Sequence, residues 1–117
     1  MRPLRIYIAG PYSAPSEEER KRNVDVAVDA GLRLLKKGHF PFIPHLTHFV
    51  DLRAIETGSQ LEWEDYINWD LGWLEASDAL LLLGRSRGAD IECGRAKELG
   101  KVIFNSIEEI PQASAES

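Results

Sequence analysis

The sequence reads Asp78-Ala79-Leu80-Leu81-Leu82-Leu83 in its second half, where five apolar residues follow one acid without a break. Five residues is an ordinary strand length, and the lack of polar alternation indicates a strand that is buried on both faces. Such strands lie at the centre of parallel sheets that carry helices on both sides. This stretch therefore predicts an α/β fold.

Upstream of this strand, the chain alternates between strand and helix patterns. Residues 4–9 form a β-branched and aromatic run that Gly10-Pro11 ends, which predicts a first strand. Residues 16–38 predict a long helix, with a serine N-cap and three acids at its start and Lys-Lys-Gly at its end. Residues 40–43 predict a short edge strand, because proline interrupts them.

The remaining segments complete the alternation. Residues 45–60 are ambiguous and suggest only a helical turn at 49–55, whereas 61–76 predict a second helix. Downstream we expect a loop at 84–90, a helix at 91–99, a strand at 102–104 and a short helix capped by Ser106. This order predicts a small flavodoxin-like (Rossmann-like) three-layer sandwich with a four- to five-stranded parallel sheet.

Length and composition set further limits. The 117 residues, 44% of them hydrophobic, fit a single domain, which we place at 1–111 with a polar tail at 112–117. The net charge of −5 argues against a nucleic-acid polymer as partner, because it disfavours a broad basic face. A chain of this length encloses a deep pocket poorly. We therefore expect a homo-oligomer, a dimer or higher, in which a second copy closes the site.

The cellular compartment is read from the single cysteine and the N-terminus. Cys93 excludes an intrachain disulfide and favours the cytoplasm, and we interpret it as a small helical hydrophobe. The apolar run at residues 4–9 is too short for a signal peptide or a membrane span, so no membrane partner is expected.

Asp70 is the most informative polar residue of the 61–76 helix. On a helical wheel it falls in the middle of the apolar face, between Ile67 and Leu74. A carboxylate there must be neutralised, hydrogen-bonded or directed into a cavity. It is either a buried cap for a neighbouring loop or a catalytic acid whose pKa burial raises.

The loop after the buried strand resembles an anion site. Ser86 and Gly88 precede a helix whose first N–H groups and dipole attract negative charge, and Arg85 or Arg87 could add a cation. This spacing places Glu92 in the first helical turn, where the dipole favours the ionised form and thus a carboxylate nucleophile. A simple helix-stabilising role for this glutamate is the alternative.

A third cluster follows the first strand. Gly10 permits close backbone approach, while Tyr7, Tyr12 and Ser13 bring hydroxyls to the edge of the sheet where ligands bind in such folds. Asn105 follows the last strand at the same edge. The chain lacks both GxGxxG and a P-loop, so no nucleotide cofactor is expected.

A metal site is not expected either. His45, His48 and Asp51 are spaced three apart, but a proline precedes them and a fourth ligand is not evident. A metal-dependent hydrolase built on these three residues remains the alternative that this spacing leaves open.

Together these segments resemble the nucleoside 2-deoxyribosyltransferase superfamily, which includes the 2′-deoxynucleoside 5′-phosphate N-hydrolases. The likeness runs from Leu4 to about Phe104. It rests on a strand before Gly10-Pro11-Tyr12, on Asn68-Trp69-Asp70-Leu71 before Ala76-Ser77-Asp78-Ala79, and on Ser86…Gly88…Glu92-Cys93-Gly94-Arg95-Ala96. Its most specific part is the pair of carboxylates at fixed places around the apolar strand.

The resemblance implies a role for each matching residue. Glu92 would attack C1′ of the sugar, Asp70 would protonate the departing base, and Tyr7 would lie beside the nucleophile. Ser86 stands where the transferases carry an acid and the phosphate-using hydrolases a serine, so a 5′-phosphate is favoured. Asn105 or Ser106 would reach the site of a partner subunit.

The expected function is cleavage or exchange of the N-glycosidic bond of a nucleoside or nucleoside 5′-monophosphate, without metal or cofactor. A glutamyl-glycosyl intermediate carries the sugar, with two carboxyls of opposite pKa tuning and hydrolysis favoured over transfer. A non-catalytic nucleotide-binding module of the same fold is the alternative.

Overall fold

The computed structural model describes residues 1–114, in which strands and helices alternate along the chain. The strands are β1 (Arg5–Ala9), β2 (Phe40–Phe42), β3 (Ala79–Leu82) and β4 (Val102–Phe104). The helices are α1 (Glu17–Lys36), α2 (Thr47–Thr57), α3 (Trp63–Glu75) and α4 (Arg87–Glu98). Two 3₁₀ turns, η1 (Pro44–Leu46) and η2 (Ile107–Glu109), complete the described elements.

The strands form one parallel sheet in the order β2-β1-β3-β4, which confirms the predicted α/β fold. Tyr7 of β1 lies between Phe42 of β2 and Leu80 of β3. The apolar run in β3 is central, as expected, and the proline-containing β2 lies at an edge. The chain runs from β1 to β2 on one side and then crosses to β3 on the other side of β1. The direction of the connections therefore changes between β1 and β3, and this is the switch point of the sheet.

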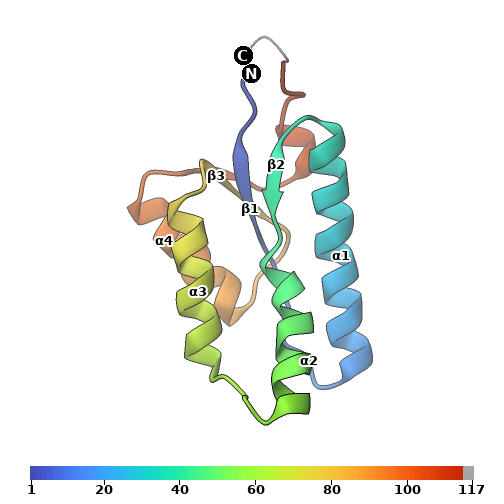
Figure 1. The fold of residues 1–117 in the computed structure, drawn as a ribbon. Helices are drawn as coiled ribbons and strands as arrows, with labels where there is room; N and C mark the ends of the chain where they lie inside the picture. Colours follow the sequence, from blue (N-terminus) through green and yellow to red (C-terminus); the bar gives the residue numbers. More distant parts are fainter. Residues whose placement is uncertain (115–117) are drawn as a thin grey trace.

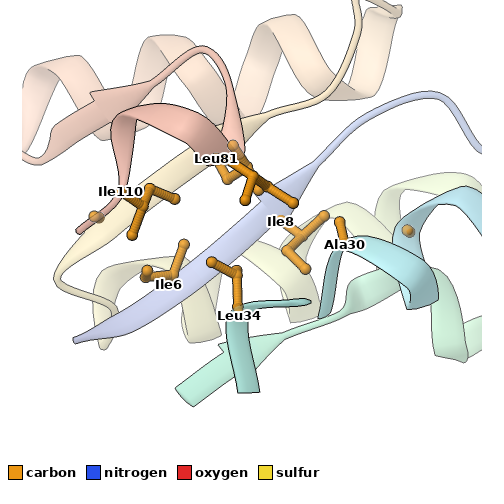
Figure 2. Packing of buried hydrophobic residues seen from close by; sticks show 9 residues of the cluster. Ile6, Ile8, Ala30, Leu34, Leu81 and Ile110 are labelled. Atoms are coloured by element: carbon orange, nitrogen blue, oxygen red, sulfur yellow. The ribbon is translucent and has the colours of Figure 1, made fainter. Parts of the chain in front are cut away.

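Helices cover both faces of the sheet, with α1 on one side and α3 and α4 on the other (Figure 1). Alternation along β1 divides the core between these layers, because successive side chains point to opposite faces. Ile6 and Ile8 pack with Leu34 of α1 and Leu81 of β3, as Figure 2 shows. On the opposite face Tyr7 packs with residues of α3 and α4.

Two helices differ from the sequence-based expectation. The ambiguous 45–60 stretch forms η1 and the full helix α2, which buries only His48 and Ala54 and so lacks a recognisable apolar stripe. The predicted loop at 84–90 was too long, because α4 begins at Arg87. Ser86 caps this helix by accepting a hydrogen bond from the Ala89 N–H at 3.1 Å.

The N- and C-terminal segments lie side by side at the end of the sheet where β1 begins (Figure 1). Ala113 N–H donates to the Lys37 carbonyl, and Ser114 N–H donates to the Met1 carbonyl, both at 2.7 Å. The rest of the predicted tail, residues 115–117, lies outside the described residues. Across residues 1–114, the helices are all too short or too polar to cross a lipid bilayer.

Candidate active site

A cavity of about 510 Å³ lies beyond the carboxyl ends of β1 and β3, at the switch point of the sheet. Its walls come from the loop after β1, from η1 and α2, from the first half of α3 and from the start of α4. Seven predicted site residues line it: Gly10, Tyr12, Ser13, Asp70, Ser86, Gly88 and Glu92. The tertiary fold thus brings together segments that are up to 82 positions apart, as the pair Gly10 and Glu92 shows.

Glu92 is buried in the second turn of α4, with 5% of its surface exposed. The expectation of a first-turn position was wrong, because α4 starts earlier, and burial opposes the ionised form that the helix dipole would favour. Burial raises the pKa of Glu92, the Tyr7 hydroxyl lowers it and the neighbouring charge of Asp70 raises it, which together give a pKa of about 8. A helix dipole is worth only about 0.3–1 kcal/mol, less than one pKa unit of desolvation.

Asp70 lies on the apolar face of α3, as the wheel predicted, and it lines the cavity with 8% of its surface exposed. Its Oδ1 atom is buried without a hydrogen-bond partner among residues 1–114, which gives the loop-capping interpretation no support. Burial raises the pKa of Asp70 to about 7. The expected opposite tuning of the two carboxyls was therefore wrong, since burial raises the pKa of both.

Tyr7 lies behind the cavity rather than on its wall, and its hydroxyl donates a hydrogen bond to Glu92 Oε2. The ring is fully buried and packs at 5.6 Å from Phe42, which stacks in turn on Trp73 at 5.5 Å. Burial and the charges of Glu92 and Asp70 raise the pKa of Tyr7, so its hydroxyl keeps its proton and acts as a donor.

The start of α4 supplies the groups suited to an anion. The N–H groups of Arg87 and Gly88 belong to the first helical turn, which has no intrahelical acceptors. The Arg87 guanidinium lies 4.4 Å from the centre of the Trp63 ring, and both residues line the cavity. Arg85, the other candidate cation, instead forms a two-point ion pair with Asp90 at 3.0 Å.

The three residues considered as metal ligands have separate partners. His45 Nε2 contacts the Gly10 carbonyl at 3.1 Å, and the Tyr12 hydroxyl contacts His48 Nδ1 at 2.8 Å. Asp51 accepts a hydrogen bond from the Tyr66 hydroxyl at 3.0 Å. In the described part of the chain, His, Cys, Asp and Glu side chains form no group of three that could hold a metal ion.

One predicted site residue lies elsewhere, and several cavity residues escaped the sequence analysis. Asn105 is exposed after β4 and does not line this cavity; its N–H donates to Glu109 Oε2 at 3.0 Å. The role expected for it in a partner's site stays a prediction. Trp63 and Tyr66 form part of the wall; the sequence favoured a core position for the tryptophans and left open that one of them forms a wall for a base.

Comparison with known proteins adds a family but not an activity. Residues 4–106 match the family model described as Domain of unknown function (DUF7768). No curated protein matches the chain.

Proposed function

This chain belongs to the DUF7768 family, and we propose that it cleaves or exchanges the N-glycosidic bond of a nucleoside or nucleoside 5′-monophosphate. One observation carries the proposal: Asp70 of α3 and Glu92 of α4 line the same cavity, and burial raises the pKa of both carboxyls. Two carboxyls around one reacting carbon are the usual machinery of glycoside chemistry.

The two carboxyls share one proton, and the role of each residue depends on which carboxyl holds it. With pKa values of about 7 and about 8, the pair holds one proton mainly between about pH 7 and pH 8. The Tyr7 hydroxyl stabilises an anion on Glu92, whereas the unpartnered Oδ1 of Asp70 favours the neutral acid. Because the pKa of Glu92 is the higher of the two, the shared proton sits mainly on Glu92 in the free protein. The reactive form that we propose, with ionised Glu92 as nucleophile and protonated Asp70 as acid, is the minor arrangement of that proton.

In the first step, a Glu92 oxygen forms a bond to C1′ while the bond from C1′ to the base nitrogen breaks. The electron pair of that bond stays on the base, which receives the proton of Asp70 and leaves as a neutral molecule. Tyr7 holds the second carboxylate oxygen and so orients the attack. The products of this step are the free base and a glycosyl ester of Glu92.

In the second step, ionised Asp70 removes a proton from water, and the water oxygen attacks C1′ as the ester bond to Glu92 breaks. The sugar leaves with a new hydroxyl, and both carboxyls return to their starting states. A second nucleobase in place of water would give exchange. We favour hydrolysis, with a 5′-phosphate bound by Ser86, Arg87 and the first turn of α4.

The oligomeric state and the cellular compartment are parts of the same proposal. The cavity is open, and we propose that a second copy of the chain closes it in a homo-oligomer. We place this enzyme in the cytoplasm, where nucleotides are abundant and a free cysteine stays reduced.

The test is release of free base from a panel of nucleosides and 2′-deoxynucleoside 5′-monophosphates, followed by chromatography. We expect Glu92→Gln to lose at least about 10³-fold in kcat and Asp70→Asn about 10²- to 10⁴-fold, as for a lost nucleophile and a lost general acid. Glu98→Gln, on the exposed side of the same helix and paired with Arg95, is the matched control and should keep full activity.

Mass spectrometry of acid-quenched protein provides an independent readout. The glycosyl ester should appear on the peptide that contains Glu92 and be absent from Glu92→Gln. No base from any substrate, or full turnover by Glu92→Gln, would refute the proposal. Nucleotide binding without base release would instead identify a non-catalytic nucleotide-binding module.

A further inference from the structure

Tyr12 belongs to a row of three hydrogen-bonded side chains that joins two helices to the loop after β1. The Tyr12 hydroxyl contacts His48 Nδ1 of α2 at 2.8 Å, and His48 Nε2 contacts Glu17 Oε1 of α1 at 3.1 Å. His48 is buried, with 5% of its surface exposed, whereas Tyr12 lines the cavity. We call Glu17, His48 and Tyr12 the relay.

The partners of His48 determine where its protons lie. A carboxylate only accepts hydrogen bonds, so the Nε2 atom that faces Glu17 carries the proton. In the neutral ring, Nδ1 is then the acceptor, and the Tyr12 hydroxyl must donate to it. Burial and the charge of Asp51 raise the pKa of Tyr12, so this hydroxyl keeps its proton.

The only proton of the Tyr12 hydroxyl is thereby committed to His48. The phenol oxygen keeps its lone pairs, so toward a ligand it can accept a hydrogen bond but cannot donate one. A row of hydrogen bonds that ends on a carboxylate also polarises this oxygen and strengthens it as an acceptor.

Further contacts hold the relay before any ligand arrives. Asn23 donates to the Tyr12 carbonyl at 3.0 Å, and Arg20 donates to the Ala14 carbonyl at 2.8 Å, which ties the loop to α1. Arg20 also pairs with the second oxygen of Glu17 at 3.0 Å, so each oxygen of this carboxylate has its own partner, His48 for one and Arg20 for the other. The position of the Tyr12 hydroxyl is therefore set in the free protein.

We infer that Glu17 and His48 are positioning residues that present the Tyr12 oxygen as an acceptor to a hydroxyl or N–H donor of the bound nucleotide. The inference rests on the proposed function and deepens it. The cavity has an anion-binding end at Ser86 and Arg87, and Tyr12 would read donors on the sugar or the base. A ligand that offers only acceptors at that point is disfavoured, because two acceptors would face each other.

The experiment measures nucleotide affinity by titration calorimetry in Glu92→Gln protein, in which binding is separated from turnover. The probes are the common 2′-deoxynucleoside 5′-monophosphates. Tyr12→Phe, added to this background, should weaken binding about 3- to 10-fold, the usual net effect of one neutral hydrogen bond. Circular dichroism and thermal melting establish that each variant is folded.

Two His48 variants separate positioning from mere structural support. The Oδ1 atom of His48→Asn can replace Nδ1 as the acceptor for Tyr12, so this variant should bind within about 2-fold of the parent. His48→Leu has a similar volume but no acceptor, and should bind as weakly as Tyr12→Phe. Glu17→Ala should also weaken binding, because His48 Nε2 then loses its acceptor. Glu18→Ala is its control, because Glu18 is exposed and pairs only with Arg22 among the described residues.

Analogues identify the donor on the ligand. A 2′,3′-dideoxynucleotide lacks the sugar hydroxyl, and an N-methylated base lacks the N–H. The analogue that lacks the donor should bind the parent about 3- to 10-fold more weakly than the unmodified nucleotide does. The same analogue and the unmodified nucleotide should bind Tyr12→Phe equally well, because the hydrogen bond is already lost there.

Unchanged affinity in Tyr12→Phe, or failure of His48→Asn to restore binding, would overturn the positioning role alone. Absence of nucleotide binding to the parent would overturn both this role and the proposed function. Weaker binding by Tyr12→Phe together with no base release from the unmodified chain would support the positioning role and refute the proposed reaction.

Discussion

Replacing Asp70 by asparagine should make the stability of the folded protein depend less on pH between about 4 and 7, at the expense of activity. Burial raises the pKa of this carboxyl from its ordinary value of 3.8 to about 7. The folded state therefore holds a proton that the unfolded chain has already released over this pH range. By proton linkage, the free energy of unfolding of the parent must fall as pH rises from about 4 to about 7.

The structure sets the size of this effect. At about 1.4 kcal/mol per pKa unit, a rise from 3.8 to about 7 corresponds to about 4 kcal/mol. Asparagine has nearly the same shape but no charge at any pH, so its cost as a buried amide, about 1–3 kcal/mol, is independent of pH. The stability difference between Asp70→Asn and the parent should thus shift by about 4 kcal/mol in favour of the variant between about pH 4 and pH 8.

Urea unfolding followed by tryptophan fluorescence measures this difference at several pH values. Asp29→Asn is the matched control: the same chemical change at an exposed position of α1, where the difference should stay within about 0.5 kcal/mol at every pH. A difference for Asp70→Asn that stays constant within about 1 kcal/mol from pH 5 to pH 8 would refute the raised pKa and, with it, the acid role of Asp70.

Three further predictions concern catalysis, binding and stability. The pH profile of kcat/KM should be bell-shaped, with a maximum between the pKa values of about 7 for Asp70 and about 8 for Glu92. Full protonation of the pair removes the nucleophile, and full ionisation removes the acid. A profile that is flat over this range would contradict the shared proton. Arg87→Ala should weaken binding of 5′-monophosphates about 10-fold by calorimetry but leave nucleosides unaffected, whereas equal losses for both would place the phosphate elsewhere. His39→Leu should lower the free energy of unfolding by about 2–4 kcal/mol, because this buried ring is hydrogen-bonded to the Leu4 N–H at 3.1 Å and to a backbone carbonyl at 2.8 Å. A change below about 1 kcal/mol in chemical denaturation would contradict a stabilising role for these two hydrogen bonds.

Much of the fold could be predicted because it depends on local patterns. The unbroken apolar run at Ala79–Leu82 indicated a central strand, and the proline in Phe40–Phe42 indicated an edge strand. Helical periodicity placed Asp70 on the apolar face of its helix, and the structure then showed that it lines the cavity. Local patterns failed at α2, because this helix buries only His48 and Ala54 and so shows no apolar stripe.

The sequence by itself determined the α/β alternation, the central strand and the face on which Asp70 lies, because periodicity and capping act over a few neighbouring residues. Only the tertiary structure decided which side chains meet: Tyr7 with Glu92, and Glu17 with His48 and Tyr12. It also decided the protonation of the carboxyl pair, since the helix position of Glu92 favours an anion and burial opposes it. Desolvation depends on all the surrounding elements at once, and no stretch of sequence contains that information.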